Sequence, residues 1–282
     1  MKLLLRLSPL ALLLIATIPS RAQTVRDVIS FTGQNQSGDP AMIPTQGRDG
    51  QLYGTSPNPR DTDGSDFRLS LGGELTVLYE FGSSANGVQP YAGITLGTDG
   101  NFYGTTSGGG SGQYGTLYKV TPRGVLTTLH SFSGQSDGSS PASAPTEGAD
   151  GNFYGTTAGN AGNPATIYKY SPSSGSVTTI YQFDASHGEE VNSPLIQASD
   201  GYLYGVAVHG GASSLGTVFK ISHIRTDHLL PQFHGQGKRR EPVWSADRGL
   251  RRAFLRHDQL GRPAQLWHGF QNGPRRPRLH LL

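Results

Sequence analysis

The eight residues Asp99–Thr106, DGNFYGTT, recur along this chain and decide its fold class. The phrase returns unchanged at Asp150–Thr157, and in variant form as DGQLYGTS at Asp49–Ser56 and DGYLYGVA at Asp200–Ala207. Its central tyrosines are spaced 50, 51 and 50 residues apart: Tyr53, Tyr103, Tyr154 and Tyr204. A period of this length marks a repeat architecture in which each unit buries its faces against its neighbours. We therefore expect four equivalent units with the four tyrosines in equivalent strands.

Each unit is predicted to contain four short strands separated by glycine-rich turns. In the second unit we expect them at Ala92–Leu96, Asn101–Thr106, Thr116–Thr121 and Val125–Phe132. Asp-Gly and Pro-Arg-Gly sequences stand between these segments and favour tight turns. Tyr, Phe, Val, Leu and Thr dominate the segments themselves, as strands prefer. A basic residue recurs in each third strand, where we expect a solvated or snorkelling side chain at a blade edge: Arg68, Lys119, Lys169 and Lys220.

Repeated four-stranded units of about 50 residues are typical of β-propeller blades. The predicted fold class is therefore all-β, a β-propeller-like array; the alternative is an open β-solenoid, whose coils have shorter periods. The segment Val28–Gly33, VISFTG, matches the end of a fourth strand such as Ser131–Gly134, SFSG, whereas the fourth unit stops resembling the others after its third strand, Gly216–Ser222. We therefore expect the N-terminal strand to complete the last blade, and four blades would suffice to close the ring.

Residues 1–22 are predicted to be a signal peptide. Lys2 and Arg6 supply the positive start, Leu10–Ile18 is apolar, and Ser20 and Ala22 are small residues at the positions that a signal peptidase reads. The apolar stretch is too short to cross about 30 Å of hydrocarbon, so we expect no transmembrane segment in the mature chain. The predicted location is secreted or cell surface. Because the chain has no cysteine, its stability after export cannot come from disulfides.

Charge divides the mature chain into two parts. Residues 23–222 hold 8 Lys and Arg against 16 Asp and Glu, whereas residues 223–282 hold 12 against 4. We therefore expect a repeat domain over 23–222 and a disordered basic tail over 223–282. A small domain and a nucleic-acid-binding arm are alternatives for the tail.

The genetic code favours another origin for the tail. If Trp267–Asn272, WHGFQN, is read one base later, its codons permit GTVFK, the sequence of Gly216–Lys220. The same shift applied to Leu255–Gln259 permits YGTTS, with the hidden tyrosine about one period after Tyr204. We interpret the tail as a product of a frame change near Ser222, and we expect no specific nucleic-acid affinity beyond a salt-sensitive charge effect.

The stretch that begins DGNFYGTTSGGGSGQYGTLYKV and continues to Gly134 resembles the tandem repeat named for Gloeobacter and Verrucomicrobia. The resemblance covers Val28–Ser222 in four units. It implies an exported bacterial protein of unassigned biochemical activity, and it brings no catalytic residues with it.

One candidate metal site stands out in the sequence. Asp61, Asp63 and Asp66 surround Gly64, and clustered carboxylate oxygens suit calcium. The segment lacks the full twelve-residue calcium loop and its distal glutamate, so a polar surface turn is the alternative. No other cofactor is expected.

Histidines mark three further positions. His187, with Glu189 and Glu190, could hold a metal but is more simply solvent-exposed, and His209 is a similar case. His130 aligns with Tyr79 and Tyr181, so we expect it to replace a packing aromatic side chain.

Two functional classes fit these observations. The first is an exported non-catalytic repeat protein that binds a glycan or a surface protein, or has a structural role. The second is a propeller lyase or lactonase with a metal in its central channel. An enzyme of this kind needs carboxylates or histidines at equivalent inward positions of several blades. The repeated aspartates stand before glycine, where turn geometry already explains them, so the sequence favours the binding or structural module.

Overall fold

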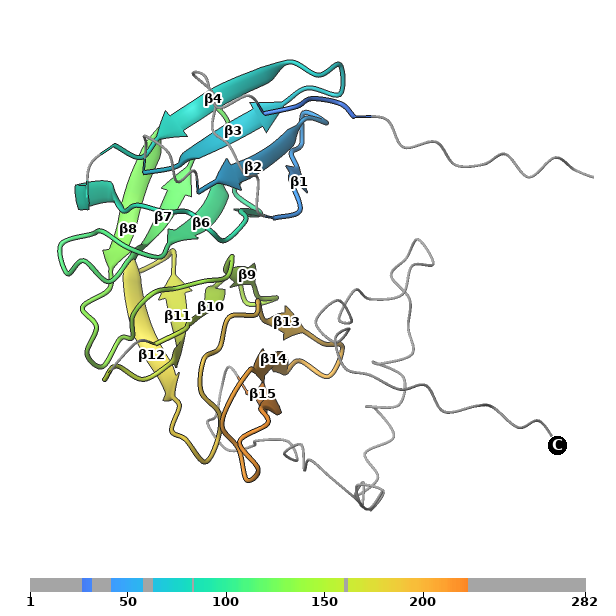
Figure 1. Cartoon of the computed structure of the whole chain (residues 1–282). Coiled ribbons are helices and arrows are strands. Elements are labelled where there is room, and N and C mark those ends of the chain that lie inside the picture. Colours follow the sequence, from blue (N-terminus) through green and yellow to red (C-terminus); the bar gives the residue numbers. More distant parts are fainter. Residues whose placement is uncertain (1–26, 32–41, 58–62, 83, 160–161, 223–282) are drawn as a thin grey trace, which may run out of the picture.

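The computed structural model describes residues 27–31, 42–57, 63–82, 84–159 and 162–222. They form four antiparallel sheets that follow one another in chain order along an open arc (Figure 1). The one helical element among the described residues is the 3₁₀ turn η1, Ser84–Asn86. The chain is thus an all-β, propeller-like array, as the repeat predicts. The predicted tail, residues 223–282, and the predicted signal peptide, residues 1–22, lie outside the described residues.

Each sheet corresponds to one sequence repeat and is called a unit here. Unit one contains β1 (Thr45–Gln46), β2 (Leu52–Ser56), β3 (Ser65–Leu69) and β4 (Leu75–Glu80). Unit two contains β5 (Thr95–Leu96), β6 (Phe102–Thr106), β7 (Thr116–Val120) and β8 (Leu126–Ser131). Unit three contains β9 (Thr146–Glu147), β10 (Phe153–Thr157), β11 (Thr166–Ser171) and β12 (Ser176–Gln182). Unit four contains β13 (Ile196–Gln197), β14 (Leu203–Ala207) and β15 (Thr217–Ile221).

The first strand of each unit is shorter than expected. In unit two, β5 begins at Thr95, although the sequence predicts a strand from Ala92. The preceding residues bond to the neighbouring unit: Thr55 Oγ1 donates to the Ala92 carbonyl at 3.0 Å, and Thr45 Oγ1 donates to the Ile94 carbonyl. Contacts between units therefore replace the strand ladder at this point.

Aromatic side chains fill the space between the sheets. Tyr53 stacks on Phe102 of the next unit with ring centroids 4.1 Å apart, and Tyr103 stacks on Phe153 at 3.9 Å. Between units three and four, Leu203 takes the place of the second ring in a cluster with Tyr154. The four repeat tyrosines thus lie in equivalent strands, as predicted, and join each unit to the next.

A second set of rings joins the fourth strand of each unit to the third strand of the following one. Its pairs have similar centroid distances of 5.2, 5.2 and 5.0 Å: Phe81–Tyr118, Phe132–Tyr168 and Phe183–Phe219. Phe31 repeats this relationship with Phe67 of unit one, at 5.4 Å. The N-terminal segment therefore occupies the place of a fourth strand that precedes unit one.

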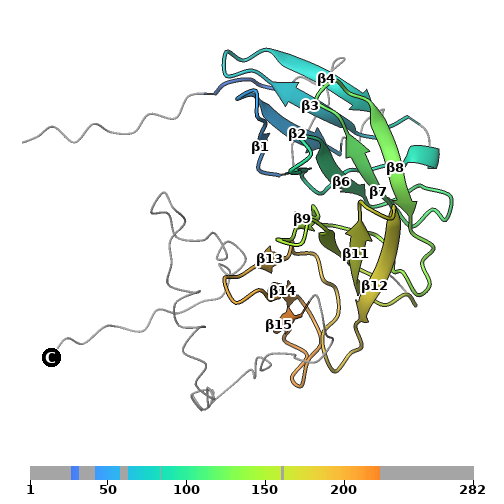
Figure 2. The same cartoon turned by 180° about the vertical axis from the view of Figure 1, so that it is seen from behind.

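The four units do not form a ring closed on themselves within the described residues. There, β15 pairs only with β14, and Val28–Phe31 lies against unit one without pairing with β15. The arc stays open in the reverse view (Figure 2). Closure with four blades is therefore not observed, although the fourth-strand character expected of Val28–Gly33 agrees with the Phe31 contact.

Candidate functional site

The repeated aspartates are structural acceptors at the turns between the first and second strands. Asp99 accepts hydrogen bonds from the Asn101 backbone at 3.0 Å and from the Tyr103 hydroxyl at 2.9 Å. Burial alone would raise the pKa of Asp99, but the hydrogen bonds from Asn101 and Tyr103 outweigh it and lower the pKa. The same tyrosine bond recurs in each of the other units, at 2.7–2.8 Å: Tyr53–Asp49, Tyr154–Asp150 and Tyr204–Asp200.

The glycine after each tyrosine makes room for an aromatic ring on the neighbouring strand. A Cβ on Gly104 would lie 2.5 Å from Tyr118 Cζ, and one on Gly54 would lie 2.6 Å from Phe67 Cζ. Glycine and ring face each other in the strand register of every unit: Gly54–Phe67, Gly104–Tyr118, Gly155–Tyr168 and Gly205–Phe219. Packing between strands therefore explains the repeated sequence, and no catalytic or binding role is needed to explain it.

The recurring basic residue lies opposite the repeat tyrosine in the register, on the third strand. Lys169 pairs with Tyr154 in the ladder, and its Nζ lies 3.8 Å from Asp150 Oδ2 and 5.9 Å from the Tyr154 ring centroid. The Lys169 side chain is 30% exposed. It is therefore half-buried beside the Asp–Tyr pair, which agrees with the snorkelling side chain that the sequence offers as one alternative.

At the ends of the strands opposite the aspartate turns, the polar side chains differ from unit to unit. The connections from second to third strand and those from one unit to the next lie on one side of the array, which we call the loop face. The two kinds of loop are joined by short bridges, Val88 with Gly108 and Glu189 with His209. In the run Gly108-Gly109-Gly110, Gly110 donates its amide to the Ser84 carbonyl, so this loop is hydrogen-bonded to the neighbouring connection.

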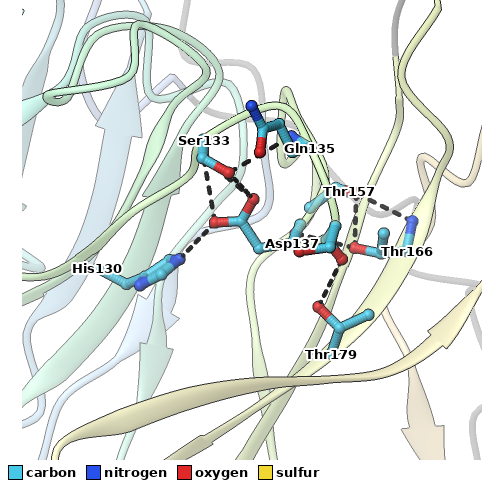
Figure 3. Close-up of polar contacts among 8 residues, drawn as sticks. His130, Ser133, Gln135, Asp137, Thr157, Thr166 and Thr179 are labelled. Atoms are coloured by element: carbon cyan, nitrogen blue, oxygen red, sulfur yellow. Dashed lines mark hydrogen bonds and ion pairs between the residues drawn. The ribbon is translucent and has the colours of Figure 1, made fainter.

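The best-defined polar cluster of the loop face lies between units two and three (Figure 3). Asp137 Oδ2 lies 3.0 Å from His130 Nε2, and Asp137 Oδ1 accepts from Ser133 Oγ at 2.5 Å. The Ser133 backbone amide also donates to Asp137. Burial opposes ionisation of Asp137, but the Ser133 and His130 bonds lower its pKa. The aspartate stands between the serine and the histidine, so this is not the serine–histidine–aspartate order of a nucleophile relay.

The main-chain carbonyl of Asp137 contacts unit three, the next unit along the chain. The Asp137 carbonyl accepts from Thr166 Oγ1 at 3.1 Å, and Thr166 Oγ1 lies 2.9 Å from Thr157 Oγ1. Gly138 follows with φ +88°, and a Cβ there would lie 2.2 Å from Thr157 Oγ1. A glycine is therefore required where the loop crosses the threonine pair.

Equivalent loops carry different side chains at the same place. Between units one and two, Asn86 donates to the Tyr79 hydroxyl at 2.7 Å. Between units three and four, the His187 ring meets the Tyr181 ring edge-on at 6.5 Å, and its Nδ1 lies 2.7 Å from Asp184 Oδ1. The strands are arranged alike in each unit, whereas the polar side chains on the loops differ from one loop to the next.

His130 behaves as the sequence predicts, because its ring packs edge-on against Phe132 at 4.9 Å, as Tyr79 packs on Phe81. Its partner Asp137 was not anticipated. Alignment of the loops could have singled out its position, since Asn86, Asp137 and His187 each stand directly before an equivalent glycine, but it could not have shown the contact with His130. The prediction that His187 and His209 are exposed agrees with their side-chain exposures of 39% and 60%.

The predicted calcium ligands have different environments. Asp66 is completely buried, and its Oδ1 accepts a hydrogen bond from the Tyr118 hydroxyl of the next unit at 2.7 Å. Asp63 is exposed, and Asp61 lies outside the described residues. Within the described ranges no group of three or more His, Asp or Glu side chains is arranged to hold a metal ion. In the same part of the chain, no helix has the length and apolar character needed to cross a membrane.

Comparison with known proteins identifies the family. The model of the Gloeobacter/Verrucomicrobia repeat matches residues 40–243, so the chain belongs to this family of repeat proteins. No curated protein matches the chain.

Several solved structures are similar to this chain at low identity. TolB from Acinetobacter baumannii is 19% identical with a TM-score of 0.47, and the match covers 69% of this chain and 44% of TolB. A nidogen/laminin complex chain is 17% identical with a TM-score of 0.41, over 64% of each chain. A gluconolactonase from Xanthomonas campestris is 13% identical with a TM-score of 0.41, over 66% of this chain and 58% of the enzyme. The chain thus spans less than two thirds of each of these proteins.

Proposed function

We propose that this chain is an exported, non-catalytic module that binds a glycan or another surface protein through its loop face. One observation carries the proposal: the polar residues that repeat in every unit bond to each other within their own turn, while the side chains that differ between units lie on the loops. Asp99 accepts from Tyr103, as its counterparts do in the other units. Asn86, Asp137 and His187, in contrast, occupy equivalent places on the loops. Rigid scaffolds with variable loops commonly use the loops for binding.

Exposed apolar side chains on the loop face support a binding role. Tyr91, in the connection between β4 and β5, is 46% exposed, and Val208, after β14, is 48% exposed. An exposed aromatic ring offers a large contact area at a low entropic cost, which suits sugar rings and protein surfaces. Val125 is 63% exposed but lies in the turn between β7 and β8, at the opposite ends of the strands.

A matched pair of variants tests this proposal on the mature full-length chain. A panel of surface polysaccharides and surface-protein ectodomains is titrated against the parent protein, Tyr91→Ala and Val125→Ala. We expect at least one member of the panel to bind the parent protein, with an affinity that falls at least tenfold for Tyr91→Ala and is unchanged for Val125→Ala. Equal losses in both variants, or binding that only Val125→Ala abolishes, would place binding away from the loop face.

Metal analysis of the purified protein distinguishes the lyase or lactonase alternative from the binding module. It requires unsatisfied carboxylates or histidines at equivalent positions of several units. The repeated carboxylates of the described units instead accept hydrogen bonds from tyrosines. A stoichiometric metal ion in the purified protein, with lactone-hydrolysing or lyase activity that a chelator removes, would favour the enzyme over the binding module.

A further inference from the structure

Five residues with side chains adopt a backbone conformation that favours glycine, and all five lie on the loop face. Among the described residues, glycine occupies 20 positions with positive φ, including all those in the turns at the opposite ends of the strands. Five other residues have φ values between 53° and 62°: Gln89, Gln113, Ser140, Glu190 and Ser214. Contacts of the Cβ disfavour this left-handed region, and strain of this kind often gathers at functional sites.

Three of the five occupy the same place in successive connections between units. Gln89, Ser140 and Glu190 each follow the equivalent loop glycine by two residues. Their carbonyls accept backbone hydrogen bonds at 3.0, 3.1 and 3.2 Å from the first residue after the second strand of the next unit: Ser107, Ala158 and Val208. These bonds involve only the backbone, so glycine would form them with less strain. Each position nevertheless has a side chain that can form hydrogen bonds, which indicates that the side chain itself is used.

In the connection between units one and two, Gln89 stands two residues before an exposed aromatic ring. The Tyr91 amide donates to the Gln89 carbonyl at 2.9 Å, and Pro90, between them, is buried. Ser107 Oγ lies 3.5 Å from Gln89 Oε1, whereas Gln89 itself is exposed and Tyr91 is 46% exposed. An amide, a hydroxyl and an aromatic ring therefore come together at one fixed place on the loop face.

In the connection between units three and four, Glu190 is held in one orientation by two neighbours. Its Oε2 lies 3.1 Å from His209 Nε2, and its Oε1 accepts from Asn192 Nδ2 at 3.2 Å. The Glu190 side chain is still 49% exposed. Each carboxylate oxygen can accept a further hydrogen bond, so Glu190 is a pre-organised acceptor for a ligand hydroxyl.

The charge of the described loop face disfavours an anionic ligand. Within the described ranges, the connections of this face carry no lysine or arginine and five carboxylates: Asp63, Asp137, Asp184, Glu189 and Glu190. The lysines and arginines of the same ranges lie in the third strands or in the turns at the opposite ends. A polysaccharide with carboxylate or sulfate groups would be repelled by this face.

We propose that the loop face binds a neutral polysaccharide, with Gln89 and Glu190 as hydrogen-bonding residues and Tyr91 as the stacking ring. This inference rests on the binding function proposed above and specifies its ligand. Sugar hydroxyls pair with amide and carboxylate groups, and the C–H face of a sugar ring packs on an aromatic side chain. Arginine, which is enriched in protein–protein interfaces, is absent from the described loop face. The side chains therefore favour a sugar over a protein partner.

Glycine variants of the full-length mature protein separate binding from stability. The probes are three neutral polysaccharides (a soluble β-glucan, an α-glucan and a galactomannan) and the anionic polygalacturonate. We expect a neutral probe to bind the parent, with an affinity that falls roughly tenfold or more in Gln89→Gly and in Glu190→Gly. Both variants should unfold at the same or a higher denaturant concentration than the parent, because the strained φ is relieved.

Gln113→Gly is the matched control. Gln113 has a φ of 62°, close to the 60° of Gln89, but its Nε2 donates to the Gly110 carbonyl within its own loop at 3.0 Å. This variant should gain stability in the same way and change the affinity by less than about twofold. Gln89→Ala, which keeps a Cβ, should lose as much affinity as Gln89→Gly.

Several outcomes would overturn the inference. They are equal losses of affinity in Gln113→Gly and Gln89→Gly, binding of Gln89→Ala at the parent's affinity, and stronger binding of polygalacturonate than of any neutral probe. If no neutral probe binds but a surface-protein ectodomain binds in a Tyr91-dependent manner, the sugar assignment is wrong and the proposed function stands. If neither kind of probe binds, both are wrong.

Discussion

The Tyr118 hydroxyl donates a 2.7 Å hydrogen bond to Asp66 Oδ1 across the boundary between units one and two, where both residues are fully buried. Asp66 Oδ2 has no hydrogen-bond partner in the described structure. At the boundary between units three and four, the equivalent residues are Ile167 and Phe219, both buried in an apolar cluster. One boundary therefore contains a buried carboxyl group where another is built from apolar side chains.

Replacing this pair with its apolar counterpart should stabilise the protein. We expect Asp66→Ile/Tyr118→Phe to raise the free energy of unfolding by about 1–3 kcal/mol, because a half-satisfied buried polar pair is removed. Tyr118→Phe alone should lower it by about 1–3 kcal/mol, since the carboxyl group then loses its only hydrogen bond. Denaturant unfolding of the parent, single and double variants measures both effects. A double variant less stable than Tyr118→Phe would contradict this account.

Asp66 should also give stability a distinctive pH dependence. Burial raises the pKa of Asp66 from 3.8 to about 7, although the Tyr118 hydrogen bond opposes the shift. The folded state therefore holds a proton that the unfolded state releases, so this contribution is complete below about pH 4 and is lost as pH rises to about 7. The stability of the parent relative to Asp66→Asn should fall across that interval. The other aspartates with shifted pKa values move in the opposite direction, so the comparison with Asp66→Asn isolates the Asp66 effect. A difference that is independent of pH would show that Asp66 has the same protonation in both states.

The repeat glycines offer a test of packing. Gly104→Ala would place a methyl group 2.5 Å from Tyr118 Cζ, and we expect a loss of about 1–3 kcal/mol of stability through overpacking. Gly82 is the control, because a Cβ there has no atom within 4 Å, and Gly82→Ala should change stability by less than about 0.5 kcal/mol. Thermal unfolding of the two variants compares them directly. Similar losses at both positions would mean that general backbone effects, rather than the Tyr118 ring, explain why glycine follows the tyrosine in every repeat.

Periodicity in the sequence predicts the strands well because equivalent residues have the same packing neighbours in every unit. Tyr103, Gly104 and Lys119 lie where the aligned repeats place them, since each meets the same neighbours as its counterparts. The buried Asp66 could not be anticipated, because its environment depends on Tyr118, which is 52 residues away. Its acidic neighbours in the sequence suggested a calcium site, but β3 is buried on both faces and Asp66 lies against Tyr118 of the next unit. The Asp137 cluster was missed for a similar reason: a residue before a glycine indicates a turn, and only the fold shows that His130 lies beside it.

The N-terminal contact leads to the last prediction. Phe31 meets Phe67 with the geometry of the three pairs between units, so Phe31→Ala should destabilise the protein even though the residue precedes the first repeat. We expect a loss smaller than the 3–5 kcal/mol typical of a buried phenylalanine such as Phe132, because Phe31 is half-buried whereas Phe132 is fully buried. Lys119→Ala, which removes a half-buried side chain, is the control with little expected effect. The order Phe132→Ala, Phe31→Ala, Lys119→Ala, from largest to smallest loss in denaturant unfolding, would confirm that the N-terminal segment packs as a fourth strand. A Phe31→Ala variant as stable as the parent would show that the segment is only loosely associated with unit one.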